Sequence, residues 1–156
     1  MLCTFIVWAL LQITPQQTNQ LQGTYKYQYG KAATGAFGLA KIYRINPSTV
    51  LLYLEVGRGA PDYNSGSLFE KLVLNPKTRK YENSLKSSTE GCKLELSQQN
   101  NQVIIKTVKG DCGFGYGVVA DGKYYLRDKT NPQYFITLAN KKVYFNKTSP
   151  ENYTID

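Results

Sequence analysis

The stretch of sequence that decides the fold class is CKLELS, residues 92–97. Its apolar side chains, Cys92, Leu94 and Leu96, alternate with polar ones. Because successive side chains of a β-strand point to opposite faces of the sheet, this period of two predicts a strand with one buried face and one solvated face. A polar turn at residues 98–101 leads to a second alternating run at residues 102–108. The two runs predict an antiparallel hairpin.

Further short strands are predicted on both sides of this hairpin. Alternating or apolar runs occur at residues 25–29, 39–45, 50–56, 67–74, 80–83, 117–120, 123–127, 134–138 and 142–145. Turn sequences separate many of them, including Asn46-Pro47-Ser48, Asn75-Pro76, Asp121-Gly122 and Asn131-Pro132. The last three runs are expected to form a tight meander. Because a helical period of apolar residues is nowhere convincing, the sequence predicts an all-β protein.

Roughly nine or ten consecutive short strands must bury their apolar faces and protect their edges. An antiparallel up-and-down meander that closes into a small barrel does both. A two-sheet β-sandwich fits the same pattern and is the alternative. The chain has 156 residues, which is the length of one ordinary domain. We therefore expect residues 19–156 to form a single barrel-like domain.

An apolar run near the start of the chain predicts export. Residues 2–11 include Phe5, Ile6 and Trp8, and the polar residues 16–20 follow them. The run is shorter than the roughly 20 residues of a membrane-spanning helix, and its length suits the apolar part of a signal peptide. We expect residues 1–18 to be a signal peptide with a truncated start, and the mature protein to be periplasmic or extracellular, without a transmembrane segment. A first buried strand or helix is the alternative.

The cysteines agree with an oxidising compartment. Removal of the predicted signal peptide takes Cys3 away and leaves Cys92 and Cys112, which flank the predicted hairpin. In an exported protein such a pair is usually a disulfide, whereas a pair of buried free thiols is the alternative. The chain has no histidine, and two cysteines alone are too few ligands for a structural zinc site. We therefore expect neither a bound metal nor another cofactor.

The sequence argues against catalysis. The absence of histidine excludes Ser-His-Asp and Cys-His nucleophile activation. Glycosidase chemistry needs two carboxylates, and the available ones are Asp62, Glu70, Asp111 and Asp121. Their spacing does not pair them. Asp121 is expected to belong to an Asp-Gly hairpin turn, and the acidic residues expected to face solvent on their strands are Glu55, Glu70 and Glu95. We therefore predict that the protein is not an enzyme.

Two segments are candidate ligand-binding loops. Residues 58–66, RGAPDYNSG, connect two predicted strands and are longer than a hairpin requires. The candidate side chains there are Arg58, Asp62, Tyr63 and Asn64. In the alternative, glycine, proline and asparagine only shape the backbone.

The second segment alternates glycine with aromatic residues at positions 113–117, GFGYG. Phe114 and Tyr116 are candidates for stacking on a sugar or a base at the barrel mouth. The alternative is a structural bulge that packs Phe114 into the core.

The net charge of +8 favours anionic surfaces. Because the basic residues are scattered, with the densest groups at Lys77-Thr78-Arg79-Lys80 and Lys141-Lys142, a generic solubilising charge and a dedicated polyanion site both remain open. Specific nucleic-acid recognition is not expected.

The segment from about residue 23 to residue 145 resembles a group of small, uncharacterised exported proteins of Bacteroidetes-type bacteria. The resemblance rests on RGAPDYNSGSL at residues 58–68, Tyr81-Glu82, Cys92-Lys93-Leu94, DCGFG at residues 111–115 continuing to Val118, and Asp121-Gly122-Lys123-Tyr124. It implies an exported β-domain with a cysteine pair. The chain is more distantly similar to periplasmic lysozyme inhibitors, which are small disulfide-bonded barrels with a glycine-rich inhibitory loop. It departs from them in its charge of +8, which would repel cationic lysozymes.

These features predict an exported, monomeric, non-enzymatic binding protein at the cell envelope, with a protein, a glycan or a small ligand as its partner. A calycin-like carrier of a small ligand is one alternative, because Gly23-Thr24-Tyr25 is similar to the start of calycin barrels. Such a carrier needs an internal cavity. An inhibitor of a cell-wall or secreted hydrolase is the other alternative.

Overall fold

The structure is a computed structural model that describes residues 20–29, 34–83 and 91–153. The predicted signal peptide at residues 1–18, with Cys3, lies outside the described residues. The described part of the chain contains ten strands and one short 3-10 turn. Their bounds are β1 Gly23–Tyr29, β2 Ala36–Asn46, β3 Thr49–Arg58, β4 Ser65–Leu74, β5 Tyr81–Asn83, β6 Lys93–Gln99, β7 Gln102–Lys109, β8 Gly122–Asp128, β9 Tyr134–Ile136, β10 Lys142–Tyr144 and η1 Pro150–Asn152. The all-β class is confirmed.

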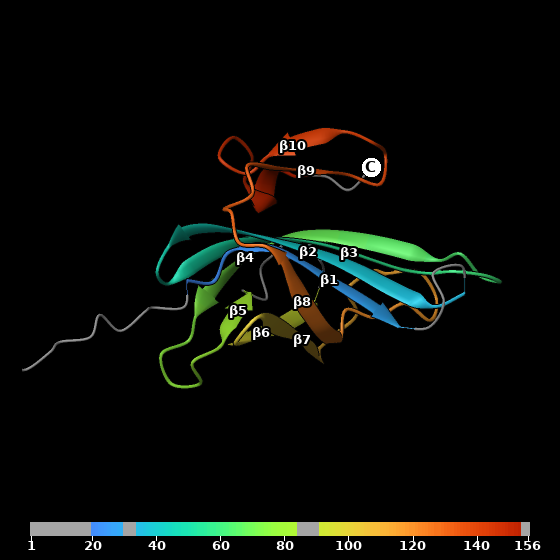
Figure 1. The fold of residues 1–156 in the computed structure, drawn as a ribbon, viewed down its shortest axis with the longest axis horizontal. Helices are drawn as coiled ribbons and strands as arrows, with labels where there is room; N and C mark the ends of the chain where they lie inside the picture. Colours follow the sequence, from blue (N-terminus) through green and yellow to red (C-terminus); the bar gives the residue numbers. More distant parts are fainter. Residues whose placement is uncertain (1–19, 30–33, 84–90, 154–156) are drawn as a thin grey trace, which may run out of the picture.

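Eight of these strands close into a barrel (Figure 1). Strands β1 to β8 are antiparallel neighbours in chain order, and β8 also pairs with β1. The closing register places Tyr25 opposite Leu126. Closure gives each of the eight strands a neighbour on both sides, which protects their edges. The predicted up-and-down barrel is therefore confirmed, and the alternative of a two-sheet sandwich is wrong.

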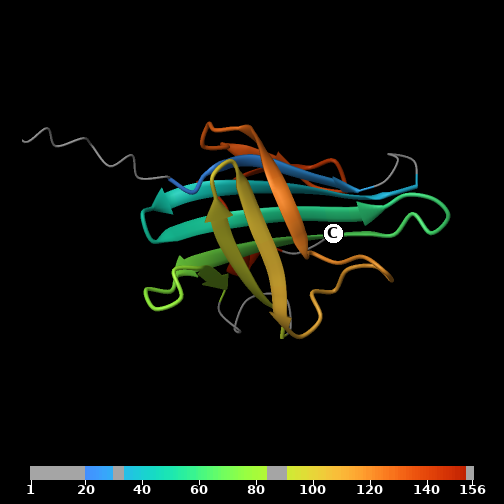
Figure 2. The same ribbon diagram turned by 60° about the horizontal axis from the view of Figure 1, so that its bottom comes forward.

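The long strands form the middle layer of the molecule. Strands β2, β3 and β4 have 11, 10 and 10 residues. In Figure 2, β6, β7 and β8 cross in front of the long strands at a steep angle. Strands β9 and β10 form a separate two-stranded sheet, which lies on the other side of the long strands in Figure 1. One face of the long strands thus lines the barrel interior, and the β9–β10 hairpin covers the other face.

Apolar side chains fill the barrel interior. Alternate residues of each strand point inward, as the register shows for Ala40, which lies opposite Tyr25 on β1 and Leu54 on β3. All three are buried. The same cluster includes Ile42, Val50, Leu52, Leu68, Leu72, Leu94, Leu96, Val103, Ile105 and Tyr124. Because full burial of one large apolar side chain contributes about 1.5–3 kcal/mol, this cluster is a major source of stability.

A second apolar cluster lies between the long strands and the β9–β10 hairpin. Tyr53 on β3 stacks on Phe135 with ring centroids 4.0 Å apart, and the ring of Phe69 on β4 lies 5.0 Å from that of Phe135. Tyr43 stacks on Phe145 at 5.4 Å. Ring pairs of this kind contribute about 0.5–1.5 kcal/mol beyond their buried area. The hairpin therefore covers a face of the barrel that would otherwise expose several aromatic rings.

The expected solvent-facing position of Glu70 is wrong. Glu70 pairs with Leu52, lies two residues from both Leu68 and Leu72 on β4, and has no exposed surface. It therefore points into the barrel. The physical reason is that Phe69 faces the hairpin, so both faces of β4 are apolar and the pattern of apolar residues does not reveal the phase of the strand.

The predicted strand at residues 117–120 is wrong, and of the predicted final meander only the pairing of its last two strands, β9 with β10, is confirmed. Residues 110–121 form a loop between β7 and β8. Asp121 does not make a hairpin turn, because its Oδ1 accepts a hydrogen bond of 2.8 Å from the backbone N–H of Thr107 and β8 begins at the next residue. Strand β8 pairs with β7 and β1 rather than with β9. Barrel closure thus separates β8 from the last two strands.

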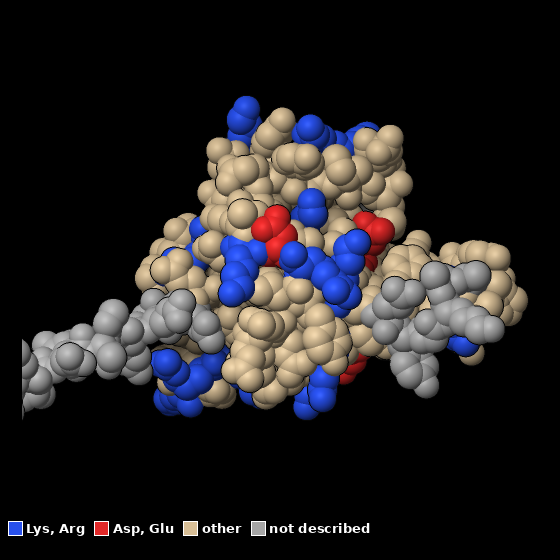
Figure 3. Space-filling view, viewed as in Figure 1, with Lys and Arg blue, Asp and Glu red and all other residues tan. Residues whose placement is uncertain are grey.

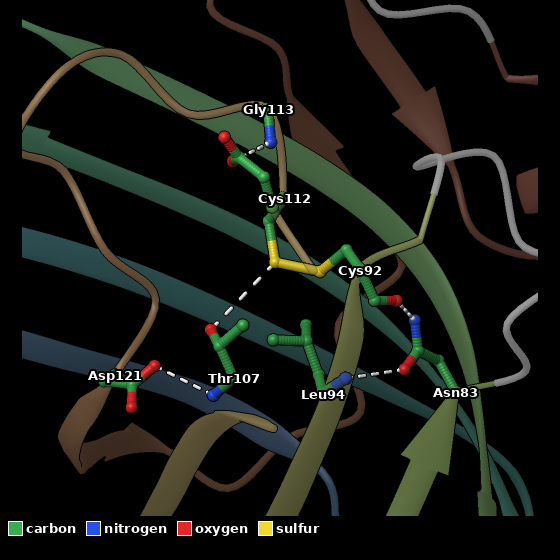
Figure 4. Close-up of a disulfide and its surroundings, with 8 residues drawn as sticks. Asn83, Cys92, Leu94, Thr107, Cys112, Gly113 and Asp121 are labelled. Carbon is green, nitrogen blue, oxygen red and sulfur yellow. Dashed lines mark hydrogen bonds between the residues drawn. A yellow bond between two sulfur atoms is a disulfide. The ribbon is translucent and has the colours of Figure 1, made fainter. Parts of the chain in front are cut away.

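The predicted disulfide is confirmed. Cys92, directly before β6, is bonded to Cys112 in the β7–β8 loop, and both residues are buried (Figure 4). Beside it, the side chain of Asn83 donates to the carbonyl of Cys92 at 3.0 Å and accepts from the N–H of Leu94 at 2.7 Å. The disulfide and Asn83 therefore tie the β7–β8 loop, β6 and β5 together.

Candidate functional site

The two predicted binding segments lie at the same end of the barrel. The register places Ala36 opposite Arg58, so the end of β3 and the start of β2 share this end. Residues 59–64 connect β3 to β4, and residues 110–121 connect β7 to β8. We call residues 58–64 and 114–116 the two-loop site. In Figures 1 and 2 the β3–β4 connection projects at one end of the long strands.

Direct contacts join the two segments. The side-chain amide of Asn64 donates to the backbone carbonyl of Tyr116 at 2.9 Å, and the N–H of Gly115 donates to the carbonyl of Ser65 at 3.2 Å. Phe114 lies directly over Gly66, where an added Cβ would be 2.5 Å from Cδ1 of the ring. Glycine is therefore required at position 66 for this close approach.

The β3–β4 connection is also braced internally. The N–H of Arg58 donates to the carbonyl of Asn64 at 2.8 Å, and the N–H of Gly59 donates to the carbonyl of Gly35 at 3.0 Å. Tyr63 has a φ of 48°, in the left-handed region that non-glycine residues seldom adopt, and its N–H donates to the carbonyl of Gly59 at 3.3 Å. These bonds hold Tyr63 in a fixed place on the loop.

The candidate side chains differ in their exposure. Tyr63 and Tyr116 are 73% and 89% exposed, so both rings are available to a partner. Nη1 of Arg58 lies 4.0 Å from Oδ2 of Asp62, and the two side chains are 45% and 44% exposed. An exposed pair at that distance contributes little, which leaves the guanidinium able to exchange Asp62 for another acceptor. The two-loop site thus presents two phenol rings and one cation.

Phe114 has a different role from Tyr116. It is half-buried and packs against the interior cluster, so it anchors the β7–β8 loop, as the bulge alternative expected. Tyr124 anchors the same loop from the barrel interior, because its buried hydroxyl donates to the carbonyl of Ala120 at 2.8 Å. Burial raises the pKa of this phenol, and the nearby Tyr27 and Asp121 raise it further. Phe114 and Tyr124 therefore support the exposed Tyr116.

Two exposed apolar residues at this end were not predicted. Phe37, at the start of β2, is 40% exposed and lies against Gly57 on β3. Val119, in the β7–β8 loop, is 65% exposed. Only the strand register brings Phe37 to Gly57, so the sequence held no local signal for it.

A pocket of about 520 Å³ lies beneath the β7–β8 loop, beside the two-loop site. Its lining includes Phe114, Val118, Val119, Asp111 and Asp121. Two of the four candidate carboxylates thus share one pocket, although their spacing in the sequence did not pair them. Asp111 accepts from the N–H of Gly113 at 2.9 Å, and Asp121 accepts from the N–H of Thr107. Both carboxylates hold the backbone of the loop, which is a structural role.

Basic side chains are spread over the face shown in Figure 3. Lys and Arg appear over the β9–β10 hairpin and over the barrel, and Asp and Glu are fewer. Nζ of Lys142 on the hairpin lies 4.4 Å from the centre of the Tyr134 ring, and Nζ of Lys41 on β2 lies 5.3 Å from it. Burial lowers the pKa of Lys41, whereas the charge of Glu55 opposes this shift. The Tyr134 ring therefore holds two cations, one from β2 and one from the hairpin.

Within residues 20–29, 34–83 and 91–153, three or more metal-ligating side chains are nowhere grouped as a metal ion would need. The same residues contain no helix that is both long and apolar enough to cross a membrane. Comparisons of the chain with protein-family models, curated proteins and solved structures find no match.

Proposed function

We propose that this protein is an exported, non-enzymatic binding domain that recognises a protein partner through the two-loop site. The observation that carries the proposal is the contact between Asn64 and Tyr116, which joins the two loops while Tyr63 and Tyr116 remain exposed. Tyrosine and arginine are enriched among the residues that dominate binding energy at protein interfaces. The site combines both residue types on one end of a closed barrel.

The shape and bracing of the site favour a macromolecular partner. The β3–β4 connection projects beyond the strands in Figures 1 and 2, so it can enter a concave surface of another molecule. Backbone hydrogen bonds within residues 58–64 and between the two loops fix its conformation before binding. A pre-organised loop loses less conformational entropy on association than a free one. A hydrolase inhibitor is one form of this function, with the hydrolase cleft as the concave surface.

The packed interior supports a surface site over an internal carrier site. Tyr25, Tyr124, Leu54, Leu68 and Leu96 are all buried within the barrel cluster, where a calycin-like carrier would hold its ligand. These side chains occupy the space that such a ligand would need.

Two further observations support an exported and non-enzymatic protein. The Cys92–Cys112 disulfide is typical of proteins that fold in an oxidising compartment. The chain lacks histidine, and of the candidate carboxylates Asp62 pairs with Arg58, whereas Asp111 and Asp121 hold backbone N–H groups. These roles account for three of the four candidate carboxylates without a reaction.

The proposal is tested by affinity capture from the host envelope and culture fluid. The bait is the oxidised protein, compared with Tyr63→Ala, Tyr116→Ala and the control Tyr125→Ala, which removes a ring that is 53% exposed on β8. We expect wild type and Tyr125→Ala to retain the same protein. Each site variant should weaken its affinity about thirtyfold or more, as loss of a dominant interface residue does.

Two outcomes would overturn the proposal. One is a partner that binds all four baits equally, which would place its contact away from the two-loop site. The other is recovery of polyanions alone, released by salt from every bait, which would assign the binding to the net charge of +8.

A further inference from the structure

A second pocket lies at the opposite end of the barrel from the two-loop site. Asn46 pairs with Thr49 at the far ends of β2 and β3, which places the β2–β3 turn at this end. The β4–β5 loop, residues 75–80, lies beside it in both ribbon views (Figures 1 and 2). The pocket has a volume of about 350 Å³. Its lining residues are Gln20, Leu21, Arg44, Pro47, Leu74, Arg79, Tyr81 and Gln98.

The floor and walls of this pocket are partly apolar. Leu21 is buried and belongs to the interior cluster, so it closes the barrel beneath the pocket. Leu74 and Pro47 form part of the wall. Tyr81 is half-buried, and its hydroxyl donates to the carbonyl of Pro47 at 2.8 Å, which fixes its ring at the rim. The pocket is therefore a cup above the packed core and not a channel through it.

Two arginines give the pocket its charge. Arg44 is half-buried on β2 and Arg79 is exposed on the β4–β5 loop. Burial raises the pKa of Tyr81, and the charges of both arginines oppose that shift, which agrees with two guanidinium groups near the phenol. The ion pairs of the barrel include Lys80–Glu95 and Lys93–Glu82. The carboxylates of β5 and β6 are thus taken by lysines, and neither pocket arginine has an acidic partner in this part of the chain.

The backbone of each arginine is held by its neighbours. The N–H of Arg44 donates to Oδ1 of Asn131 at 2.8 Å, and Nδ2 of Asn131 donates to the carbonyl of Arg44 at 3.2 Å. Arg79 has a φ of 59°, and its N–H donates to the carbonyl of Asn75 at 2.9 Å. Oδ1 of Asn75 also accepts from the N–H of Lys77 at 3.0 Å. The guanidinium groups therefore extend from fixed points, which reduces the entropy lost when they bind a common ligand.

We propose that this cup, formed by Arg44, Arg79, Tyr81 and Gln98 above Leu21, binds the oxyanion group of a small organic acid or phosphate ester. Arginine presents a planar fork of N–H donors that matches carboxylate and phosphate oxygens. Gln98 offers an amide donor, and Leu74 and Pro47 suit a short apolar part of the ligand. A volume of about 350 Å³ lies at the small end of the range for small-molecule sites.

The test is titration of the isotope-labelled protein by NMR with inorganic phosphate, succinate and uncharged succinamide, at constant ionic strength. Succinate and phosphate separate the two sources of an oxyanion, and succinamide removes the charge. We expect saturable shifts at the backbone amides of Leu21, Arg79 and Gln98 with at least one anion, and none with succinamide. The same spectra report whether each variant is folded.

The variants are Arg44→Gln and Arg79→Gln, with Arg127→Gln, an exposed arginine on β8, as the charge-matched control. Loss of a charge-assisted contact should weaken anion binding about tenfold or more, whereas Arg127→Gln should change it less than about twofold. If Arg44→Gln fails to fold, Arg79→Gln on the exposed loop carries the test alone. Absence of saturable shifts with both anions, or equal weakening by Arg127→Gln, would overturn the proposal.

Discussion

The side-chain amide of Asn64 donates a hydrogen bond of 2.9 Å to the backbone carbonyl of Tyr116, a residue 52 positions away along the chain. The backbone carbonyl of the same Asn64 accepts from the N–H of Arg58. Asn64 therefore closes its own loop and holds the neighbouring one. The conformations of the two loops consequently depend on each other, and a substitution in one loop should alter the conformation of the other.

Substitution of Gly66 tests this dependence. In Gly66→Ala the new Cβ would meet the ring of Phe114, and we expect the free energy of unfolding to fall by about 1–3 kcal/mol because one side must move. Urea denaturation measures the loss. In a Phe114→Ala background the same substitution should cost less, since the nearest clashing atom is gone. Equal costs in the two backgrounds would show that the ring is not the source of the strain, which would then come from the backbone Cα of Phe114, 2.9 Å from the added Cβ.

Asn83 is expected to be one of the most sensitive polar residues. Its side chain takes the place of a strand partner at the end of β5, donating to the carbonyl of Cys92 and accepting from the N–H of Leu94. Asn83→Ala leaves these buried groups without that partner, at about 1–3 kcal/mol each. We expect a total loss of about 2–6 kcal/mol in urea denaturation. The exposed Asn101→Ala, at the β6–β7 turn, should change stability by less than about 0.5 kcal/mol.

Removal of the disulfide should destabilise the fold without abolishing the barrel pairing. The bond closes a loop with a sequence separation of 20, for which the chain-entropy model gives about 3 kcal/mol. The double variant Cys92→Ala/Cys112→Ala should lower the free energy of unfolding by about that amount. Reduction of the wild-type protein provides an independent comparison. An unchanged urea midpoint after complete reduction would contradict the prediction.

The sequence predicted those strands whose two faces differ in environment. On β6, Leu94 and Leu96 point to the interior while Glu95 points away from it, so alternation reported the phase correctly. On β4, Leu68 and Phe69 are both buried because the hairpin covers the outer face. The pattern therefore could not place Glu70, whose position follows from the register with Leu52. Local periodicity does not reveal that a distant segment, here the β9–β10 hairpin, covers the outer face of a strand.

The candidate site was predictable in its parts but not as a unit. The length of the connection indicated residues 58–64 as a candidate binding loop, and the alternation of glycine with aromatic residues indicated Phe114 and Tyr116. Their contact depends on closure of β8 onto β1, which brings distant segments to one end of the barrel. The approach of Phe37 to Gly57 follows from the register of β2 and β3, and the pocket of Arg44 and Arg79 follows from the fold, so the local sequence pattern indicated neither.

The β9–β10 hairpin should unfold more readily than the barrel when its central ring is removed. Phe135 contacts both Tyr53 and Phe69, and Phe135→Ala is expected to cost about 3–5 kcal/mol of local packing energy. Hydrogen exchange should then speed up in residues 134–145 and stay slow in β2 and β3. The control is Ile136→Ala, which removes the neighbouring side chain, 37% exposed. Equal loss of protection throughout the chain would mean that hairpin and barrel unfold together.

Alkaline pH should destabilise the protein through its buried tyrosines. Burial raises the pKa of Tyr25, Tyr53 and Tyr124 above the ordinary value of 10.0. Between the unfolded and folded pKa values the native state binds more protons, so the contribution of these tyrosines to stability is constant below the ordinary value and falls as pH rises above it. The fall is at most about 1.4 kcal/mol per pH unit for each tyrosine.

Tyr124→Phe isolates one of these contributions. The variant loses the hydrogen bond to the carbonyl of Ala120, so its free energy of unfolding at neutral pH should be lower by about 1 kcal/mol. Above pH 10 its stability should decline less steeply than that of wild type, because one buried phenol no longer titrates. Urea denaturation from neutral pH to about pH 11 measures both effects. The exposed Tyr125→Phe serves as the control, and parallel decline of Tyr124→Phe and wild type would contradict the prediction, since burial of Tyr124 would then not govern its ionisation.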